Sequence, residues 1–82
     1  MNNDYEKRIT LDSHIMAGKP IIKGTRITVE LILRLLGEGE TVEEILHEYP
    51  QVTREDVFAA LKYATHIIEE EKVFPLADFR YA

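Results

Sequence analysis

The chain has 82 residues, no cysteine, 45% apolar residues and a formal net charge of −5. A chain of this length forms a single domain that buries only about 60 to 65% of its unfolded surface, so its core is marginal unless a partner adds to it. The absence of cysteine excludes disulfides, cysteine-ligated metals and a cysteine nucleophile. No apolar run has the form of a signal peptide or approaches the ~20 residues that span a bilayer. We therefore expect a cytoplasmic protein with no membrane contact.

The charges are unevenly distributed along the chain. Between Lys7 and Arg34 there are six cations and two acids, whereas from Leu35 onward there are four cations and eleven acids. A basic surface on an acidic protein can still contact phosphate, because salt screens surface charges beyond roughly 8 Å. On charge alone, a solvated surface of uneven composition is the simpler interpretation.

Residues 8–12 alternate between polar and apolar types, with Ile9 and Leu11 on one side, and this predicts a short, half-exposed strand. A second extended piece is expected at residues 20–22. Neither is long enough to be stable alone, so we expect them to pair as a ribbon within the monomer or with a partner chain. Residues 8–27 are thus assigned to short strands and a glycine-containing connector.

The connector at residues 18–28 contains two glycines, a proline and three cations. It predicts a turn that exposes a cationic loop. Glycine-flanked backbone amides and nearby cations suit an anion, so four side chains are candidate phosphate contacts: Lys19, Lys23, Thr25 and Arg26. The alternative is that the segment only shapes the turn, with Arg26 paired to an acid such as Glu30.

Three helices are expected over residues 28–72, each preceded by a threonine that can cap it. Thr28 precedes the first, which runs to about Leu36; Thr41, in a capping box with Glu44, precedes the second, which ends before Pro50; Thr53 precedes the third, which runs to Glu71 or just beyond. The third carries an apolar stripe predicted to face the core: Val57, Ala60, Leu61, Ala64, Ile67 and Ile68.

The first helix is apolar nearly all round, which favours a homodimer with this helix at or near the interface. Leu31 and Leu35 form its second apolar face and are the candidate dimer contacts. A monomer in which the N-terminal ribbon shields this helix is the alternative.

Residues 41–71 have the outline of a helix-turn-helix, with a break at residues 50–53. A helix that reads DNA brings donors to the base edges from its first turns, and here those turns offer Arg54 followed by Glu55 and Asp56. Arg54 is a candidate DNA contact, but the two acids make the third helix an improbable sole reader.

The ordered motifs of the chain resemble the domain of unknown function 433 family over Ile9 to Ala64. The matching residues are Gly18-Lys19-Pro20-x-Ile22-x-Gly24-Thr25-Arg26-Ile27, Thr41-x-x-Glu44-Ile45-Leu46-x-x-Tyr49-Pro50 and Thr53-x-x-Asp56-Val57-x-Ala59-Ala60-Leu61-x-Tyr63-Ala64. The resemblance implies a mainly α fold: a trihelical, homeodomain-like bundle of helix-turn-helix character with a short N-terminal β ribbon. It also implies an antitoxin of a type II toxin-antitoxin pair, often encoded beside a PIN-like nuclease.

The C-terminal tail, residues 73–82, combines aromatic, aliphatic and cationic side chains without a helical period. Such a segment suits extended docking in a partner groove, where a cation can pair with the metal-binding carboxylates of a nuclease. The candidate toxin contacts are Phe74, Leu76, Phe79 and Arg80. The alternative is that these apolar residues fold back on the core of their own chain or of a dimer partner.

Catalytic readings of the sequence are weak. Asp12-Ser13-His14 has the residue types of a triad, but adjacent residues point apart. The spaced pairs His66 with Glu70 and Glu43 with His47 each offer two metal ligands where zinc needs three or four. We therefore expect a non-enzymatic, antitoxin-like homodimer without metal or cofactor. Its partners would be a PIN-like toxin and, as an additional candidate, operator DNA; the alternative is a homodimeric protein-interaction module with no DNA-binding role.

Overall fold

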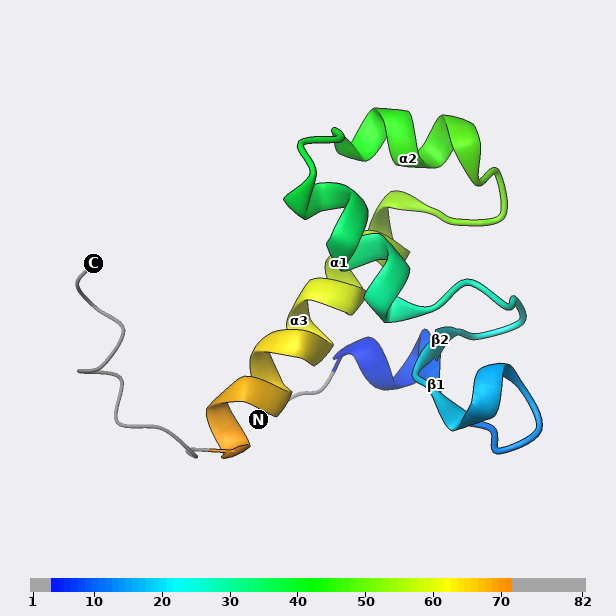
Figure 1. Ribbon diagram of the computed structural model, residues 1–82, viewed down its shortest axis with the longest axis vertical. Coiled ribbons are helices and arrows are strands. Elements are labelled where there is room, and N and C mark those ends of the chain that lie inside the picture. Colours follow the sequence, from blue (N-terminus) through cyan, green and yellow to red (C-terminus); the bar gives the residue numbers. More distant parts are fainter. Residues whose placement is uncertain (1–3, 72–82) are drawn as a thin grey trace.

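A small antiparallel ribbon and two short 3-10 helices form the N-terminal part of the computed structural model, which describes residues 4–71 (Figure 1). The elements are η1 (Asp4–Lys7), β1 (Ile9–Thr10), η2 (Met16–Gly18) and β2 (Ile21–Ile22). Ile9 lies opposite Ile22, so the ribbon pairs within the monomer. The strand expected over residues 8–12 is shorter than predicted and Leu11 is 59% exposed, because Asp12 begins a turn that its carbonyl closes by accepting from the Ile15 amide.

Three helices follow: α1 (Val29–Gly37), α2 (Val42–Glu48) and α3 (Arg54–Glu71). The expected threonine caps are confirmed for α1 and α2, since the Thr28 hydroxyl accepts from the Leu31 amide and Thr41 forms a reciprocal capping box with Glu44. Thr53 caps α3 by accepting from the Asp56 amide, and the Asp56 carboxylate accepts from the Thr53 amide in return. These side chains satisfy amides that the first helical turns leave without partners. The expected mainly helical fold with an N-terminal ribbon is confirmed.

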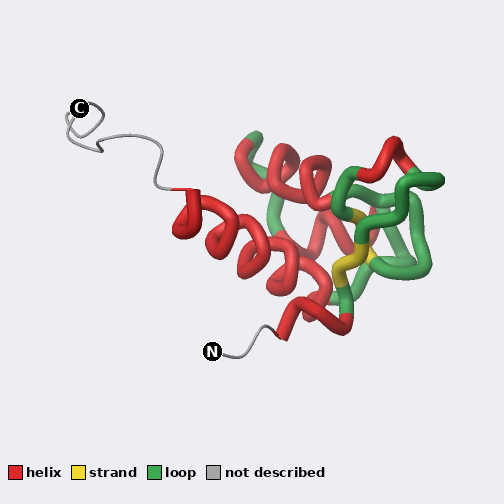
Figure 2. Tube along the Cα trace, turned by 90° about the horizontal axis from the view of Figure 1, so that it is seen from below, coloured by secondary structure: helices red, strands yellow, loops and turns green. Residues whose placement is uncertain are grey.

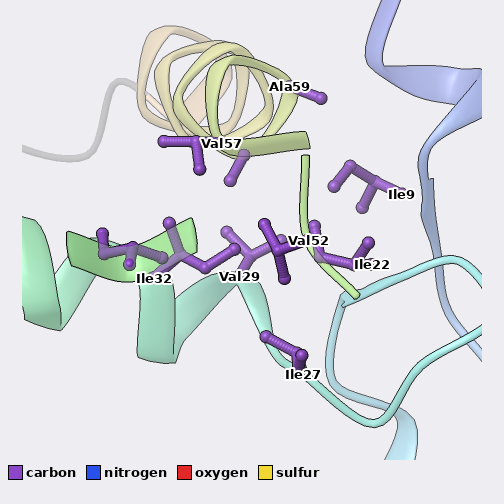
Figure 3. Packing of buried hydrophobic residues seen from close by; sticks show 10 residues of the cluster. Ile9, Ile22, Ile27, Val29, Ile32, Val52, Val57 and Ala59 are labelled. Atoms are coloured by element: carbon purple, nitrogen blue, oxygen red, sulfur yellow. The ribbon is translucent and has the colours of Figure 1, made fainter. Parts of the chain in front are cut away.

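The core lies where the ribbon, α1, α2 and the first half of α3 meet (Figure 3). Ile32 of α1, Ile45 of α2 and Val57 of α3 are fully buried, so each helix contributes at least one complete aliphatic side chain worth roughly 1.5 to 3 kcal/mol of burial. The buried cluster consists of Ile9, Ile22, Ile27, Val29, Ile32, Ile45, Val52, Val57, Ala59 and Ala60. Because the ribbon supplies two members, it is part of the core and not an appendage.

The second half of α3 extends beyond α1 and α2 (Figures 1 and 2). Its neighbour there is η1, where Tyr5 packs edge to face on Tyr63 with ring centroids 5.3 Å apart. The predicted stripe is therefore only partly right: Val57 and Ala60 are buried, but Leu61, Ile67 and Ile68 are exposed. The helical period was correct, but the elements that would cover its later turns do not reach them. No helix within residues 4–71 combines the length and apolarity needed to cross a membrane.

Candidate binding surfaces

The connector folds into a tight β-hairpin that presents its cations at the tip. The Ile22 amide donates to the Ile27 carbonyl (2.8 Å), and the Thr25 amide donates to the Ile22 carbonyl (3.0 Å). Gly24 adopts φ +84°, a left-handed conformation that favours glycine, with no atom near its missing Cβ. The Thr25 hydroxyl donates to the Ile22 carbonyl and accepts from the Ile27 amide, which ties the turn together. Thr25 thus has a structural role in the turn.

The cations predicted to contact phosphate divide into paired and unpaired groups. Lys19 binds Glu30 at 2.9 Å and Arg54 binds Glu43 at 2.8 Å. The hydrogen bond from Lys19 lowers the pKa of Glu30, and the one from Arg54 lowers the pKa of Glu43. Lys23 is exposed and forms no ion pair with any residue in the range 4–71.

Arg26 likewise lies exposed at the hairpin tip, and within the described part of the chain it has no ion-pair partner. The alternative that Arg26 pairs with Glu30 is wrong, because the Glu30 carboxylate is occupied by Lys19 and by Arg34 one turn further along α1. The hairpin tip therefore offers two cations, Lys23 and Arg26, whose donors are available to a ligand.

A groove of about 830 Å³ runs beside the hairpin tip. Its walls come from the ribbon, the hairpin, α1 and the α2–α3 connection, and they mix aliphatic side chains with polar ones. The lining residues are Thr10, Leu11, Asp12, Ile15, Ile21, Gly24, Thr25, Arg26, Ile27, Leu31, Tyr49 and Gln51. Arg26 is thus a cation at the edge of a largely apolar groove, an arrangement that suits a peptide or another partner of mixed chemistry.

The first turn of α3 is occupied by intramolecular contacts. Asp56 is only 6% exposed and accepts from Arg8 Nη1 at 3.1 Å as well as from the Thr53 amide. Arg54 is held by Glu43 of α2. Because the Arg54 guanidinium is engaged and Glu55 is exposed beside it, this end of α3 is poorly suited to enter a DNA groove.

Acidic side chains cover one face of α2. Glu43, Glu44 and Glu48 of α2, together with Glu40 just before the helix, line a surface hollow that His47 also borders. Burial of the carboxyl group, followed by the nearby Glu48, raises the pKa of Glu40. Within residues 4–71 no three histidine, cysteine or acidic side chains are grouped so as to hold a metal ion.

The residues considered for catalysis serve local structure. The Asp12 carboxylate accepts from the His14 amide at 2.8 Å, which closes a side-chain turn at an exposed site. His66 Nε2 lies 3.3 Å from Glu70 Oε2 on α3, and the His66 ring is tilted by 50° against the Tyr5 ring, with the ring centroids 5.9 Å apart. Glu43, which was weighed with His47 as a two-ligand metal pair, binds Arg54.

The proposed interface residues have different surroundings. Leu31 and Leu35 of α1 are half-buried and pack against the core, and their role in a dimer stays a prediction. The large apolar side chains that α3 exposes are Phe58 (46%), Leu61 (41%), Ile67 (38%) and Ile68 (73%). The apolar period of α3 did not predict this exposed surface. The greater length of α3 compared with α1 and α2 could have indicated that its last turns lie beyond them. The tail residues Phe74, Leu76, Phe79 and Arg80 lie outside the described residues.

These features define a small, mainly helical domain in which a β-hairpin with a basic tip precedes three capped helices. The family described as "Protein of unknown function (DUF433)" matches residues 9–64, more than half of the chain, and the protein belongs to this family. The match ends inside α3, before its overhanging turns.

Two relatives are similar to this chain. The crystal structure of a DUF433 member protein from Anabaena variabilis ATCC 29413 superimposes with a TM-score of 0.72 at 28% sequence identity, covering 80% of this chain and 69% of that one. An uncharacterized protein from Archaeoglobus fulgidus is 52% identical over 29 residues, which are 35% of this chain and 81% of that protein.

Proposed function

We propose that the protein is a non-enzymatic, antitoxin-like regulator that binds a PIN-like toxin nuclease and contacts operator DNA through the tip of its β-hairpin. The observation that supports the DNA contact is the pairing pattern of the connector cations. Lys23 and Arg26 lie exposed on a hydrogen-bonded turn without ion-pair partners among the described residues, whereas Lys19 and Arg54 are paired with acids. Cations without an ion-pair partner can contact phosphate without first breaking an intramolecular pair.

A salt-dependent gel shift with the DNA upstream of the gene tests this contact. Lys23→Ala/Arg26→Ala should weaken binding and reduce the slope of log K against log salt concentration by about 2, because each phosphate contact contributes roughly 1. The matched control is Lys19→Ala/Arg34→Ala, which removes the same charge from side chains that both bind Glu30. If both double variants lost the same DNA affinity, the loss would be explained by net charge alone, and the hairpin tip would be rejected as the DNA contact.

Toxin binding is proposed for the tail, residues 73–82, whose sequence combines three aromatic side chains with Arg80. An arginine inserted among metal-binding carboxylates would compete with the metal of a nuclease. Co-expression with the product of the neighbouring open reading frame, followed by affinity purification and a ribonuclease assay, tests the role. Deletion of residues 73–82 should abolish co-purification and restore nuclease activity; a complex that survives the deletion would contradict it.

A homodimeric protein-interaction module without DNA binding is the second candidate. It is favoured by the acidic first turn of α3, where Asp56 is buried in contact with Arg8 and Glu55 is exposed. Absence of any gel shift at low salt, together with intact binding of the partner protein, would favour this candidate over the first.

A further inference from the structure

α3 carries an apolar stripe that begins in its first half, where Phe58 and Leu61 are only partly covered, and continues onto its overhanging turns as far as Ile68. Phe58, Leu61, Thr65 and Ile68 recur at intervals of three, four and three residues, so they share one face of the helix. Three of these four are large, and Ile68 is the most exposed large apolar side chain in residues 4–71. Phe58, Leu61 and Ile68 together expose roughly 300 Å² of side chain, at the lower end of the range in which contiguous apolar patches mark interaction sites.

We propose that this stripe binds the same stripe of a second copy of the chain, with the two α3 helices antiparallel about a two-fold axis near Thr65. In such an isologous contact, residue i of one copy meets residue j of the other and the reverse also holds. An axis at Thr65 brings Leu61 of each copy opposite Ile68 of the other. Leu61 and Ile68 thus cover each other in two symmetric pairs, whereas Phe58 lies beyond these pairs at each end of the contact.

The charges beside the stripe favour this orientation. Lys62 and Glu69 are seven residues apart, two helical turns, and therefore lie on the same flank of the stripe. In the antiparallel arrangement, Lys62 of each copy lies next to Glu69 of the other, so two complementary pairs form by symmetry.

Thr65 is suited to the crossing point. Its side chain is small, which lets the two helices approach closely. Its hydroxyl already donates to the Leu61 carbonyl one turn earlier at 2.9 Å. Burial at the interface would therefore not leave its hydroxyl hydrogen without an acceptor.

The surroundings of the stripe argue against an anionic ligand there. The exposed acids Glu55, Glu69 and Glu70 accompany Lys62 along this part of α3. A nucleic acid or an anionic membrane would be repelled by such a surface. A second copy offers apolar cover and opposite charges at the same time, and two stripes with their flanks bury on the order of 1,000 Å² in total, at the lower limit of specific interfaces. This contact does not depend on whether the protein binds a toxin or DNA.

Sedimentation equilibrium of the full chain tests the proposal. We expect a concentration-dependent equilibrium between the 9.5 kDa monomer and a dimer of twice that mass, with a dissociation constant on the order of micromolar. Ile68→Asp should weaken the dimer at least about 100-fold, since two unpaired charges would be buried by symmetry. Leu11→Asp is the matched control, because Leu11 is also exposed but lies in the loop after β1; it should leave dimerisation unchanged.

Cysteine cross-linking locates the axis, because the natural chain contains no cysteine. Thr65→Cys should give a disulfide-linked dimer under mild oxidation, since residues at a two-fold helix crossing come within the ~5.5 Å Cα separation that a disulfide needs. Gln51→Cys, at an exposed site in the α2–α3 connection, should not. Lys62→Glu and Glu69→Lys should each weaken the dimer, and the double variant should restore it.

Three results would overturn the proposal. The first is a chain that stays monomeric at millimolar concentration. The second is a dimer that Ile68→Asp does not weaken, with circular dichroism showing that the variant is folded. The third is a dimer that appears only when residues 73–82 are deleted, which would assign the tail, and not a second copy, to this face of α3.

Discussion

Replacement of Asp56 with alanine removes a carboxylate that links Arg8, just before β1, to α3. The Asp56 carboxylate accepts from the Thr53 amide at 3.0 Å and from Arg8 Nη1 at 3.1 Å, and the residue is almost fully buried. Loss of the cap should cost about 1 kcal/mol. Loss of the bond to Arg8 should cost a further 1 to 2 kcal/mol or so, a value moderated because the Arg8 side chain is 42% exposed and can be rehydrated. We therefore expect Asp56→Ala to lower the free energy of unfolding by about 2 to 3 kcal/mol.

Glu44→Ala is the internal control for this prediction. Glu44 closes the same type of capping box with Thr41 at the start of α2, but it is exposed, and its carboxylate makes no second hydrogen bond or ion pair within residues 4–71. Its loss should cost only about 0.5 to 1 kcal/mol. Urea denaturation monitored by circular dichroism measures both values. Equal costs for the two variants would refute the idea that Asp56 does more than cap its helix.

A double-mutant cycle isolates the bond between the ribbon and the helix. Arg8→Ala, Asp56→Ala and the double variant should show a coupling of about 1 kcal/mol, because the second change removes nothing once the first partner is gone. A coupling near zero would mean that Asp56 is stabilised by the cap alone and that Arg8 only covers the surface.

The remaining predictions concern backbone geometry, ionisation and packing. Gly24→Ala should lower the free energy of unfolding by about 1 kcal/mol, because Gly24 has a positive φ. Gly37→Ala should be neutral or stabilising, because Gly37 lies in the last turn of α1 with open space beside it. If urea denaturation showed the reverse order, the hairpin geometry would be contradicted. The pKa of Glu40 is raised in the folded state, so the fold favours the protonated carboxyl. The folded state is therefore not penalised below the ordinary pKa of 4.5, and it loses stability as pH rises through the raised pKa and the carboxyl ionises. Glu40→Gln should therefore raise the melting temperature at pH 7 and give no such gain at pH 4, and an equal gain at both would contradict this. Ile32→Ala should cost about 2 to 5 kcal/mol, enough to unfold much of the population, because the side chain is fully buried between the helices; a loss below 1 kcal/mol would show that the core collapses around the cavity.

Features fixed by neighbouring residues could be predicted from the sequence. The caps at Thr28, Thr41 and Thr53 were predictable because each depends on a hydrogen bond within three residues. The turn at Gly24 was predictable because few other residues tolerate its conformation. The match to the family also rests on these local motifs.

Features that depend on how elements meet could not be predicted in the same way. Which cation binds Glu30 depends on the path of the hairpin, and this path brings Lys19, eleven residues away, to the carboxylate in preference to Arg26. The burial of Asp56 depends on Arg8, which is distant in sequence. The exposure of Ile67 and Ile68 depends on the length of α3 relative to its neighbours, a difference that the apolar period does not contain.

The two proposed surfaces lie on opposite sides of the domain, with the hairpin to one side and the last turns of α3 to the other (Figures 1 and 2). A dimer formed through α3 would therefore leave both hairpin tips accessible and relate them by the two-fold axis. Two linked tips bind a palindromic site with higher avidity than one tip can. We expect Ile68→Asp, which leaves Lys23 and Arg26 intact, to abolish the preference for a palindrome over a single half-site in gel shifts. Its affinity for the half-site should remain within about threefold of the unmodified chain. If Ile68→Asp lowered the affinity for the palindrome and for the half-site equally, Ile68 would belong to the DNA contact itself. Dimerisation would then not be the cause of the preference for a palindrome.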